Sequence, residues 1–575
     1  MIKTLGKFVK QYKKVSILTS LCMAMEVTME MIIPLLMSTV IDKGVEKGDF
    51  KYVITTGALM LFVALCSLSF GALSGVFGAK ASTGFAKNLR KGMYDNIQNF
   101  SFAEIDKYST AGLITRLTTD VTNVQQAYQM LLRMCIRSPF TFVCAMVMVL
   151  SIDARLGLIF VAAALILGFA LFFIIGKVNP KFREVFKRYD DLNASVQENI
   201  SGMRVVKAFV REKHETGKFT TATNKLKKMF VSAENLIILN TPIMQFVMYS
   251  CILLLSWLGA KMIVSGSLTT GELTAMFTYT SNILMSLMMI SMIFVMLTMS
   301  LASGERISEV LNQESSIKNP ENPVFEVKDG SVTFENVSFS YLSDPDKINL
   351  KNVNIDIKSG ETIGIIGGTG SAKSAFVQLL PRLYDVMEGC VKVGGIDVKE
   401  YDMDTLRNNV AMVLQKNVLF SGSIKENLKW GKKDATDEEI IEACKLACAD
   451  EFIEKLPQKY DTHIEQGGAN VSGGQKQRLC IARALIKKPK ILILDDSTSA
   501  VDTATDLKIR KAFKEYIPET TKFIIAQRIS SIQDADRIIV LDNGKINGVG
   551  THDELLENNT IYKEVYTTQM KGADL

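Results

Sequence analysis

The sequence is poor in the residues that build disulfide frameworks and metal sites. Its 575 residues include nine cysteines and three histidines. No two cysteines form a Cys-x-x-Cys pair, their number is odd and five lie in apolar runs, so a disulfide framework is not expected. Cys444 and Cys448 lie four residues apart on an expected helix, but no histidine is nearby, which argues against zinc. We interpret the cysteines as small buried hydrophobic residues in a reducing or lipid setting.

The chain also lacks a strong excess of one charge. Its net charge of +6 is modest for this length. A nucleic-acid-binding protein usually carries a concentrated basic face, so no nucleic-acid partner is expected. The small positive excess weakly favours contact with anionic lipid headgroups. No cleavable signal peptide is expected either, because the apolar stretch behind the basic N-terminus is too long and has no small-residue cleavage pattern.

Apolar residues are concentrated in residues 1–310, which we expect to be a membrane domain. A helix that spans a bilayer needs about 20 mainly apolar residues. Six segments meet or approach this requirement, the first interrupted by Glu26 and Glu30 and the third extending back toward Arg133: Val15–Ile41, Tyr52–Gly78, Ser138–Ile152, Leu156–Gly176, Leu236–Ala260 and Leu273–Met299. The sequence therefore predicts six spans in a lipid bilayer.

Basic residues predict how these spans are oriented. Residues 1–14 contain five lysines and no acidic residue, and residues 177–234 contain thirteen Lys or Arg. By the positive-inside rule, the N-terminus, residues 79–130 and 177–234, and everything after Met299 face the cytoplasm of a cell membrane. The two internal segments are expected to be long helical extensions that turn at Ser101–Ser109 and at Arg211–Lys218.

Two groups of residues in the spans are candidates for a substrate cavity. Glu26 and Glu30 lie on one helix face, and Arg133 and Arg137 are candidate partners for them. A structural ion-pair cluster and a contact with cationic substrate both remain open. A second group forms a helical stripe, which suits either helix packing or an adaptable substrate surface: Met285, Met289 and Met292.

A linker is expected at residues 311–329, where the apolar pattern ends. Asn319-Pro320 and Asn322-Pro323 break the amphipathic helix that precedes them. A rigid domain is expected from Gly330 to the C-terminus at residue 575.

This C-terminal domain contains a phosphate-binding loop between an apolar strand, Ile363–Ile366, and a helix. The backbone N–H groups of such a loop attract phosphate oxygens. Lys373 is expected to reach the β- and γ-phosphates, and Ser374 to bind Mg²⁺. Ala372 stands where the pattern has glycine, and Ala375 lacks a hydroxyl that is common there. The loop consists of Gly367, Gly368, Thr369, Gly370, Ser371, Ala372, Lys373, Ser374 and Ala375.

Further motifs of this domain lie elsewhere in its sequence. A second apolar strand, Ile491–Leu494, ends in Asp495, which is expected to hold Mg²⁺ through water. Upstream, a helix opens with a segment whose backbone amides would face a phosphate: Ser472, Gly473, Gly474 and Gln475. Four further positions belong to the same set: Tyr341, Gln415, Asp502 and Gln527.

With these motifs the chain resembles a half-transporter of the six-span ATP-binding cassette (ABC) exporters, over essentially its whole length. The resemblance implies an α-helical six-span transmembrane domain plus an α/β P-loop NTPase cassette with a RecA-like core and a helical subdomain. It implies ATP and Mg²⁺ as cofactors, with Ser374, Gln415 and Asp495 at the metal. It also implies that Tyr341 stacks on adenine and that Asp502 communicates across a dimer.

In this family two cassettes face head to tail, and each ATP lies between one cassette's phosphate loop and the other's signature segment. Asp496 stands where a catalytic Glu is expected, and Gln527 where a His is expected. A carboxylate that is one methylene shorter lies about 1.5 Å back, and misplacement of about 1 Å can lower a rate about 100-fold. We therefore expect a heterodimer with a second half-transporter, in which Ser472–Gln475 complete the competent site of the partner.

Alternatives to this prediction are a homodimer with slow Asp-based hydrolysis and an ATP-gated channel. The expected cargo of an exporter is an amphipathic small molecule, a lipid or a peptide. Pocket shape depends on both subunits, so the sequence does not choose among these classes.

Overall fold

The structure is a computed structural model that describes residues 1–341, 344, 346–497 and 500–571, without the side chains at 171, 175, 179, 183, 186, 187, 190, 194, 291, 294, 295, 298, 299 and 571. The chain forms two compact units. Residues 1–98 and 110–313 make the helical unit, and residues 99–109 and 314–575 make the cassette unit. A short internal segment, 99–109, therefore belongs to the same unit as the C-terminal half of the chain.

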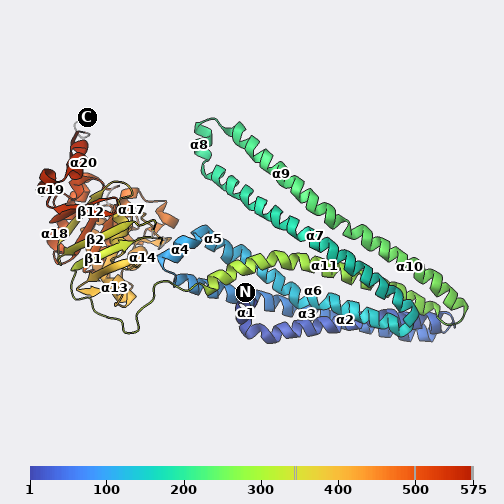
Figure 1. Cartoon of the computed structure of the whole chain (residues 1–575). Helices are drawn as coiled ribbons and strands as arrows, with labels where there is room; N and C mark the ends of the chain where they lie inside the picture. The colour runs from blue at the N-terminus through green and yellow to red at the C-terminus, as the bar shows by residue number, and fades with distance from the viewer. Residues whose placement is uncertain (342–343, 345, 498–499, 572–575) are drawn as a thin grey trace. The chain divides into compact units, whose positions relative to one another are not determined.

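The helical unit consists of long α-helices with short 3₁₀ and π segments. Its elements are α1 (Ile2–Gly6), η1 (Lys7–Tyr12), α2 (Lys13–Thr39), η2 (Val40–Val45), α3 (Phe50–Gln98), α5 (Thr110–Thr115), η3 (Arg116–Asp120), α6 (Val121–Ile152), α7 (Ala154–Ser201), α8 (Met203–Ala208), α9 (Glu212–Ile238), α10 (Asn240–Val264) and α11 (Thr270–Asn312). Helices α2, α3, α6 and α11 lie together, whereas α7, α9 and α10 form a long hairpin that diverges from them (Figure 1).

Six helices in the described residues are long and apolar enough to cross a membrane, which confirms the predicted number of spans. They lie in Ile2–Val45, Phe50–Gln98, Thr110–Ile152, Ala154–Phe182, Glu212–Val264 and Thr270–Ile290. The ends of two are set by side-chain caps. Asp153 accepts hydrogen bonds from the backbone N–H groups of Arg155 and Leu156, and Thr269 forms a capping box with Glu272.

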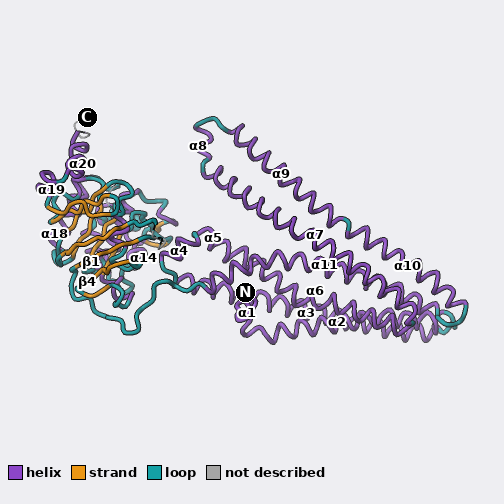
Figure 2. Tube along the Cα trace, in the orientation of Figure 1, coloured by secondary structure: helices purple, strands orange, loops and turns teal. Residues whose placement is uncertain are grey.

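The tips of the two helical extensions differ in how well the sequence located them. The first tip contains a short helix, α4 (Phe102–Tyr108), inside the expected Ser101–Ser109. The second turn lies at residues 202–211, around α8, and not at Arg211–Lys218, because α9 already begins at Glu212. The backbone leaves the helical region at Val210, whose φ is 54°. Figure 2 shows the break in the helical tube on either side of α8.

The cassette unit mixes strands with short helices. Its helices besides α4 are α12 (Lys373–Gln378), α13 (Met403–Asn409), α14 (Ile424–Lys429), α15 (Asp437–Leu446), α16 (Asp450–Ile453), α17 (Gly473–Leu485), α18 (Thr503–Tyr516), α19 (His552–Asn558) and α20 (Thr560–Lys571), with η4 (Lys459–Asp461), η5 (Gln466–Gly468) and η6 (Ile529–Ser531). Its strands are β1 (Val332–Phe339), β2 (Leu350–Ile357), β3 (Thr362–Gly367), β4 (Glu388–Val393), β5 (Ile396–Asp397), β6 (Val410–Val413), β7 (Gly422–Ser423), β8 (His463–Ile464), β9 (Ile491–Asp495), β10 (Thr521–Ile525), β11 (Arg537–Asp542) and β12 (Lys545–Gly550).

Three sheets organise these strands. A four-stranded antiparallel sheet has the order β2-β1-β4-β5, a six-stranded sheet the order β12-β11-β3-β10-β9-β6, and β7 pairs with β8. In the six-stranded sheet β11, β3, β10, β9 and β6 run parallel, and β12 is antiparallel to β11. The carboxyl ends of β3, β6, β9 and β10 therefore meet at one edge, which is where ligands bind in open α/β sheets.

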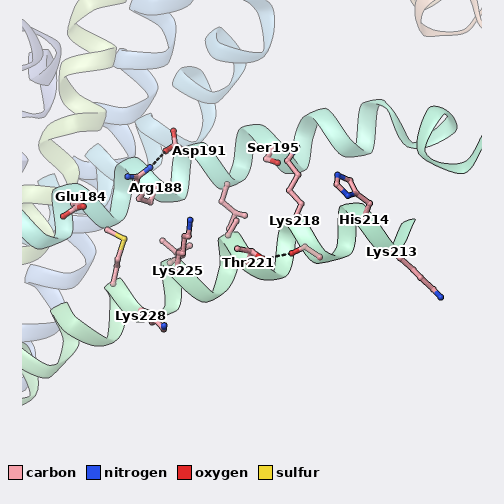
Figure 3. A pocket seen from close by; sticks show the side chains of 15 residues that line it. Glu184, Arg188, Asp191, Ser195, Lys213, His214, Lys218, Thr221, Lys225 and Lys228 are labelled. Carbon is pink, nitrogen blue, oxygen red and sulfur yellow. Dashed lines mark hydrogen bonds and ion pairs between the residues drawn. The ribbon is translucent and has the colours of Figure 1, made fainter. Parts of the chain in front are cut away.

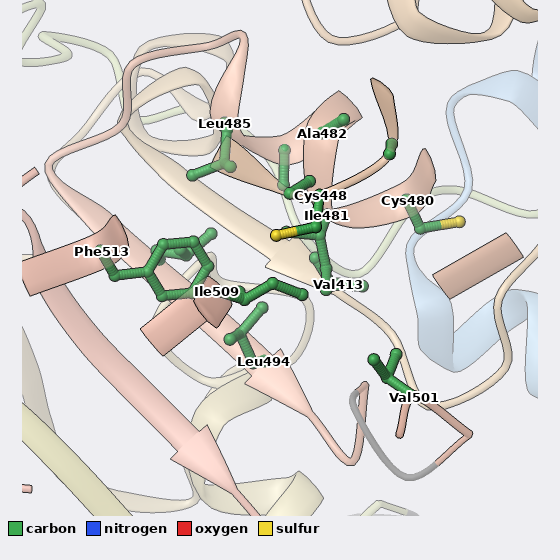
Figure 4. Close-up of a cluster of buried hydrophobic side chains, with 14 of the residues drawn as sticks. Val413, Cys448, Cys480, Ile481, Ala482, Leu485, Leu494, Val501, Ile509 and Phe513 are labelled. Atoms are coloured by element: carbon green, nitrogen blue, oxygen red, sulfur yellow. The ribbon is translucent and has the colours of Figure 1, made fainter. Parts of the chain in front are cut away.

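Burial on both faces explains why β9 reads as an uninterrupted apolar run. Leu492 and Leu494 pack in a core with α17 and α18, seen in Figure 4 around Ile481, Ile509 and Phe513. Ile491 and Ile493 point to the other core, where the Phe334 and Phe376 rings stack with centroids 4.2 Å apart. A parallel strand covered on both faces is continuously hydrophobic.

The segment expected to be a linker continues α11 and then follows the surface of the cassette unit. Helix α11 ends at Asn312. Val324 then forms a β-bridge with Tyr401, and Asn319 donates a hydrogen bond to Asp402. Residues 314–329 are thus ordered by contacts with their own unit.

Candidate functional site

The phosphate loop follows β3 at the carboxyl edge of the six-stranded sheet. A Cβ on Gly367 would lie 2.1 Å from the carbonyl oxygen of Leu541, so the close approach of β11 requires glycine there. Ala372 is left-handed, with φ 71° and ψ 26°. The pattern has glycine at this position because a Cβ disfavours that conformation, so Ala372 retains the backbone shape at some cost.

Lys373 and Ser374 point toward the end of β9. The Lys373 ammonium donates hydrogen bonds of 2.8 Å to the carbonyl oxygens of Gly367 and Gly368. Burial lowers the pKa of Lys373, and the nearby carboxylates of Asp495 and Asp496 oppose that shift. The hydroxyl of Ser374 donates a 3.1 Å hydrogen bond to Asp495. The loop and the second apolar strand, expected to act together, are therefore joined directly.

Ser374 and Asp495 form the donor set for a divalent metal. Burial raises the pKa of Asp495, against the hydrogen bond from Ser374. No group of three or more His, Cys, Asp or Glu residues suited to a metal occurs in the described part of the chain. One hydroxyl and one carboxylate fit Mg²⁺, which is usually bound by one or two protein oxygens together with water and substrate phosphates.

Asp496 and Gln527 contact each other, although 31 positions separate them in the chain. The Gln527 side-chain amide donates a 2.9 Å hydrogen bond to the Asp496 carboxylate. The pairing of β10 with β9, which places Ile525 opposite Asp495, brings the two residues that follow these strands together. The two departures from the family pattern thus form one interacting pair.

Tyr341 and Gln415 flank this edge in different ways. The Tyr341 ring lies edge-on to the rings of Phe339 and Tyr384, with centroids 4.9 and 5.0 Å away. Its hydroxyl donates a 3.0 Å hydrogen bond to Gln378, and burial raises its pKa to about 12. Gln415 follows β6 and is exposed.

The signature segment, Ser472–Gln475, forms the first turn of α17. Ser472 and Gln475 make a capping box, with 2.9 and 3.3 Å hydrogen bonds between the backbone of each and the side chain of the other. A Cβ on Gly474 would lie 2.8 Å from the carbonyl oxygen of Ala500. Asp502, two residues further, caps α18 by accepting from the Thr505 N–H at 2.9 Å. The signature and the Asp502 turn are therefore packed against each other.

Comparison with known proteins identifies the family. Residues 16–313 match the family model described as ABC transporter transmembrane region, and residues 350–499 match the one described as ABC transporter. The chain is 38% identical over 562 residues to an uncharacterized ABC transporter ATP-binding protein of Bacillus subtilis, YfiB, covering 98% of this chain and 97% of that protein. The chain belongs to the ABC transporter family.

Other relatives are similar over their whole length. An ABC transporter ATP-binding protein of Mycobacterium bovis is 34% identical over 582 residues, covering 100% of this chain and 99% of that protein. Bacillus subtilis YgaD, named as a candidate multidrug export ATP-binding/permease protein, is 31% identical, with 99% of each chain covered. A bacterial Atm1-family ABC exporter with ATP bound has the same fold, with a TM-score of 0.84, 24% identity and coverage of 97% and 99%.

These findings confirm the predicted family and the predicted fold, a six-span helical domain fused to a cassette. The transporter is a multi-pass membrane protein, and its cassette implies ATP hydrolysis coupled to transport.

In the membrane domain, one arginine pairs with both candidate carboxylates. Arg137 contacts Glu26 at 2.5 Å and Glu30 at 2.8 Å. Arg133, the other candidate partner, lies against Gly78, and its buried Nε has no hydrogen-bond partner among the described residues. This geometry favours the ion-pair interpretation of the cluster.

The methionine stripe is largely uncovered. Met285 is 61% and Met292 60% exposed, and Met289 is half-buried. These side chains do not pack in the core of a single transporter chain, so they are available to lipid, cargo or a second subunit.

A groove that no sequence pattern predicted lies between α7 and α9. It measures about 1000 Å³ and is lined by both charge signs, including Glu184, Arg188, Asp191, Lys213, Lys218 and Lys225. In Figure 3 the lysine side chains diverge, so the groove presents no convergent set of ligands.

Sequence reasoning also missed one residue next to the nucleotide site. Gln569, on α20, donates to the carbonyl oxygen of Gln527 at 2.8 Å and accepts from the N–H of Ile529 at 2.9 Å. A glutamine near the end of an amphipathic helix belongs to no motif, and only the fold brings it to this loop.

Proposed function

We propose that the chain is one subunit of a heterodimeric ABC exporter. In this proposal its own nucleotide site binds ATP and hydrolyses it slowly, while Ser472–Gln475 complete the hydrolytic site of the partner. The observation that carries the proposal is the pair at the ends of β9 and β10, where the Gln527 amide donates to the Asp496 carboxylate at 2.9 Å.

This pair is poorly suited to activate water. The Asp496 carboxylate is about 1.5 Å shorter in reach than that of Glu, and misplacement of about 1 Å can lower a rate about 100-fold. The Gln527 amide neither accepts a proton nor carries positive charge at neutral pH. The two side chains bond each other and supply no well-placed base.

Binding of ATP requires contacts with its phosphates, its base and Mg²⁺, but no base that activates water, and the other residues of the site would supply these contacts. Lys373 and the loop amides would contact phosphate oxygens, Tyr341 would contact the base, and Ser374, Asp495 and Gln415 would hold Mg²⁺. When bound, Mg²⁺ neutralises phosphate charge. The burial of Asp495 favours an arriving cation, because a desolvated carboxylate gains most from a neighbouring positive charge.

The signature segment carries the features that the partner's ATP requires. Helix α17 has 13 residues, and its N-terminus carries the partial positive charge that suits a phosphate. The Ser472 cap and the contact of Gly474 with Ala500 fix the first turn. This pre-ordering supports a role in another chain's hydrolysis.

The proposed cargo is an amphipathic small molecule, a lipid or a peptide, moved out of the cytoplasm across the cell membrane with the cassette on the cytoplasmic side. The exposed Met285 and Met292 support this class, since thioether side chains adapt to varied apolar shapes. The relative named for multidrug export, YgaD, supports it as well.

The test compares ATP turnover of the assembled pair after two single substitutions, one in this chain's own nucleotide site and one in its signature segment. Asp496→Asn should alter turnover by less than about twofold, because the partner's site carries the flux. Ser472→Ala should lower it by at least about tenfold, on the scale of a lost transition-state contact. A large loss with Asp496→Asn contradicts the proposal.

Ser423→Ala is the matched control for this test. Ser423 caps α14 with the same capping-box geometry, accepting from the Glu426 N–H at 3.0 Å. It should cost about 1 kcal/mol of stability, as any lost cap does, without a comparable loss of turnover. Brisk phosphate release by the chain without a partner would instead favour the homodimer.

A further inference from the structure

The segment that carries Gln527 is gripped by the last helix of the cassette. We define the switch segment as residues 526–532, between β10 and the turn after η6. We propose that Gln569 of α20 is a positioning residue of the nucleotide site, which holds the switch segment so that the Gln527 side chain faces Asp496.

The contact is bidentate. The Gln569 amide donates its N–H to the carbonyl oxygen of Gln527 at 2.8 Å, and its oxygen accepts the N–H of Ile529 at 2.9 Å. A primary amide is the side-chain group that presents one donor and one acceptor side by side, as a neighbouring strand would. The Gln569 side chain therefore hydrogen-bonds the backbone of the switch segment in the way that a paired β-strand would.

The first half of helix α20 is held in place by burial and hydrogen bonds, which fixes the position from which Gln569 reaches the switch segment. Tyr562 is fully buried, its hydroxyl lies 2.7 Å from Nδ1 of His552, and its N–H donates to Asn559 at 2.9 Å. Gln569 lies seven positions further, about 10 Å along a helix. The buried first half of α20 thus fixes where its second half meets the switch segment.

A second side chain holds the other end of the switch segment. Asp506 of α18 accepts a 3.3 Å hydrogen bond from Ser531, and Ile529, whose N–H bonds Gln569, is itself 2% exposed. Because Gln569 bonds the carbonyl of Gln527 itself, it governs the residue whose side chain bonds Asp496. Asp506 acts four residues downstream.

The grip has a consequence for nucleotide recognition, which rests on the proposed function. With its backbone held, Gln527 needs only a side-chain rotation to exchange Asp496 for the terminal phosphate of ATP as acceptor. ADP has no phosphate there and gains nothing from this exchange. Gln569 therefore supports the preference of this site for ATP over ADP, and does not support affinity for nucleotides in general.

The experiment measures the dissociation constants of ATP and ADP, with Mg²⁺, for the full-length chain and for Gln569→Met. Methionine keeps the length of the side chain and removes both hydrogen bonds. ATP affinity should fall about fivefold, the value of one hydrogen bond, while ADP affinity stays within about twofold. Thr568→Ala is the matched control and should change neither, because the Thr568 hydroxyl donates to the carbonyl oxygen of Glu564 within α20.

A double variant separates positioning from general loosening. In a Gln527→Ala background the ATP preference should already be reduced, and Gln569→Met should then add no further loss. An unchanged ATP-to-ADP ratio in Gln569→Met, equal losses for both nucleotides, or a full additional loss in the Gln527→Ala background overturns the inference. If the unaltered chain binds no ATP, the proposed function fails as well, so the two failures are distinguishable.

Discussion

At the scale of single residues, one position of the phosphate loop has a backbone conformation that its side chain disfavours. Ala372 has φ 71°, a left-handed conformation that the family pattern assigns to glycine. The left-handed region costs an alanine about 1–2 kcal/mol. The loop keeps its shape because β3 and α12 on either side are fixed by the core, so the strain is retained.

Ala372→Gly should relieve this strain. We expect the free energy of unfolding of the cassette to rise by about 1 kcal/mol, less the backbone entropy that glycine loses on folding. Thermal unfolding without nucleotide measures it. Ala375→Gly is the matched control in the same loop: Ala375 lies in α12 and is buried, so glycine there should destabilise by about 1 kcal/mol. Equal signs for the two substitutions would contradict the strain.

Asp495 is a carboxylate in a buried position, where loss of solvent disfavours its charged form. Its folded pKa is raised by burial above the unfolded value of 3.8. The ionised form is therefore less favourable in the folded state, and the penalty develops as the pH rises through the folded pKa.

Asp495→Asn should remove this penalty while keeping an oxygen for Ser374. At pH 7 and without nucleotide, we expect the unfolding free energy of the cassette to rise, because the substitution removes the cost of a buried charge. The gain should shrink as the pH falls toward 3.8, because the native Asp495 then binds a proton in both states. Unfolding of both proteins across this range checks the sign; a gain that grows at low pH would disprove it. Affinity for ATP with Mg²⁺ should fall.

At the scale of elements, the end of α11 is clamped to its neighbours. Arg306 makes hydrogen bonds of 2.8 and 2.5 Å to Asp120, which is 1% exposed. Arg116 pairs with Glu309 at 3.0 Å. Asn96 of α3 donates to the carbonyl oxygens of Val310 and Gln313 at 2.7 and 2.9 Å, satisfying acceptors that a helix end leaves open. The last turns of α11 are therefore held by both α3 and the π segment η3.

Arg306→Ala should destabilise the helical unit by about 2–3 kcal/mol, because it leaves the buried Asp120 carboxylate with fewer donors. Asp120→Asn should cost less, since it removes the buried charge. The readout is the melting temperature of the detergent-solubilised transporter. Arg188→Ala, in an exposed 3.6 Å pair with Asp191, is the control, with an expected effect below about 1 kcal/mol. A larger loss for Asp120→Asn than for Arg306→Ala would refute the clamp.

At the scale of the whole molecule, the helical unit exposes apolar surface that a water-soluble protein would bury. Phe169, Phe172 and Phe246 of the α7–α10 hairpin are 74%, 79% and 75% exposed. Large apolar surfaces of this kind indicate contact with lipid or a second chain. The charges inside the spans are grouped instead, with Arg137 between Glu26 and Glu30.

Arg137→Met should sharply lower the folded yield, because two carboxylates then stay in the membrane without a cation. Adding Glu26→Gln and Glu30→Gln should restore most of the yield, since the triple variant carries no charge at these three positions. Transport by the triple variant then decides the role of the cluster. Loss for cationic compounds alone would indicate substrate contact, whereas equal loss or equal retention for cationic and neutral compounds would indicate a structural role.

The sequence alone determined the features that depend on local pattern. Six apolar runs of membrane-spanning length are spans because hydrocarbon leaves no alternative for such segments. The loop before Lys373 and the apolar strand before Asp495 identified the cassette, because phosphate chemistry demands those residue types at those spacings. The positions of Asp496 and Gln527 could be read against the family pattern for the same reason.

The tertiary structure alone decided which distant residues meet. Strand pairing joins Asp496 to Gln527, and the burial of Tyr562 brings Gln569 to the switch segment. Arg137, rather than Arg133, holds Glu26 and Glu30, and the second turn falls at residues 202–211 rather than at Arg211–Lys218. Helical periodicity leaves neighbouring turns equivalent, so only packing against other elements chooses between them.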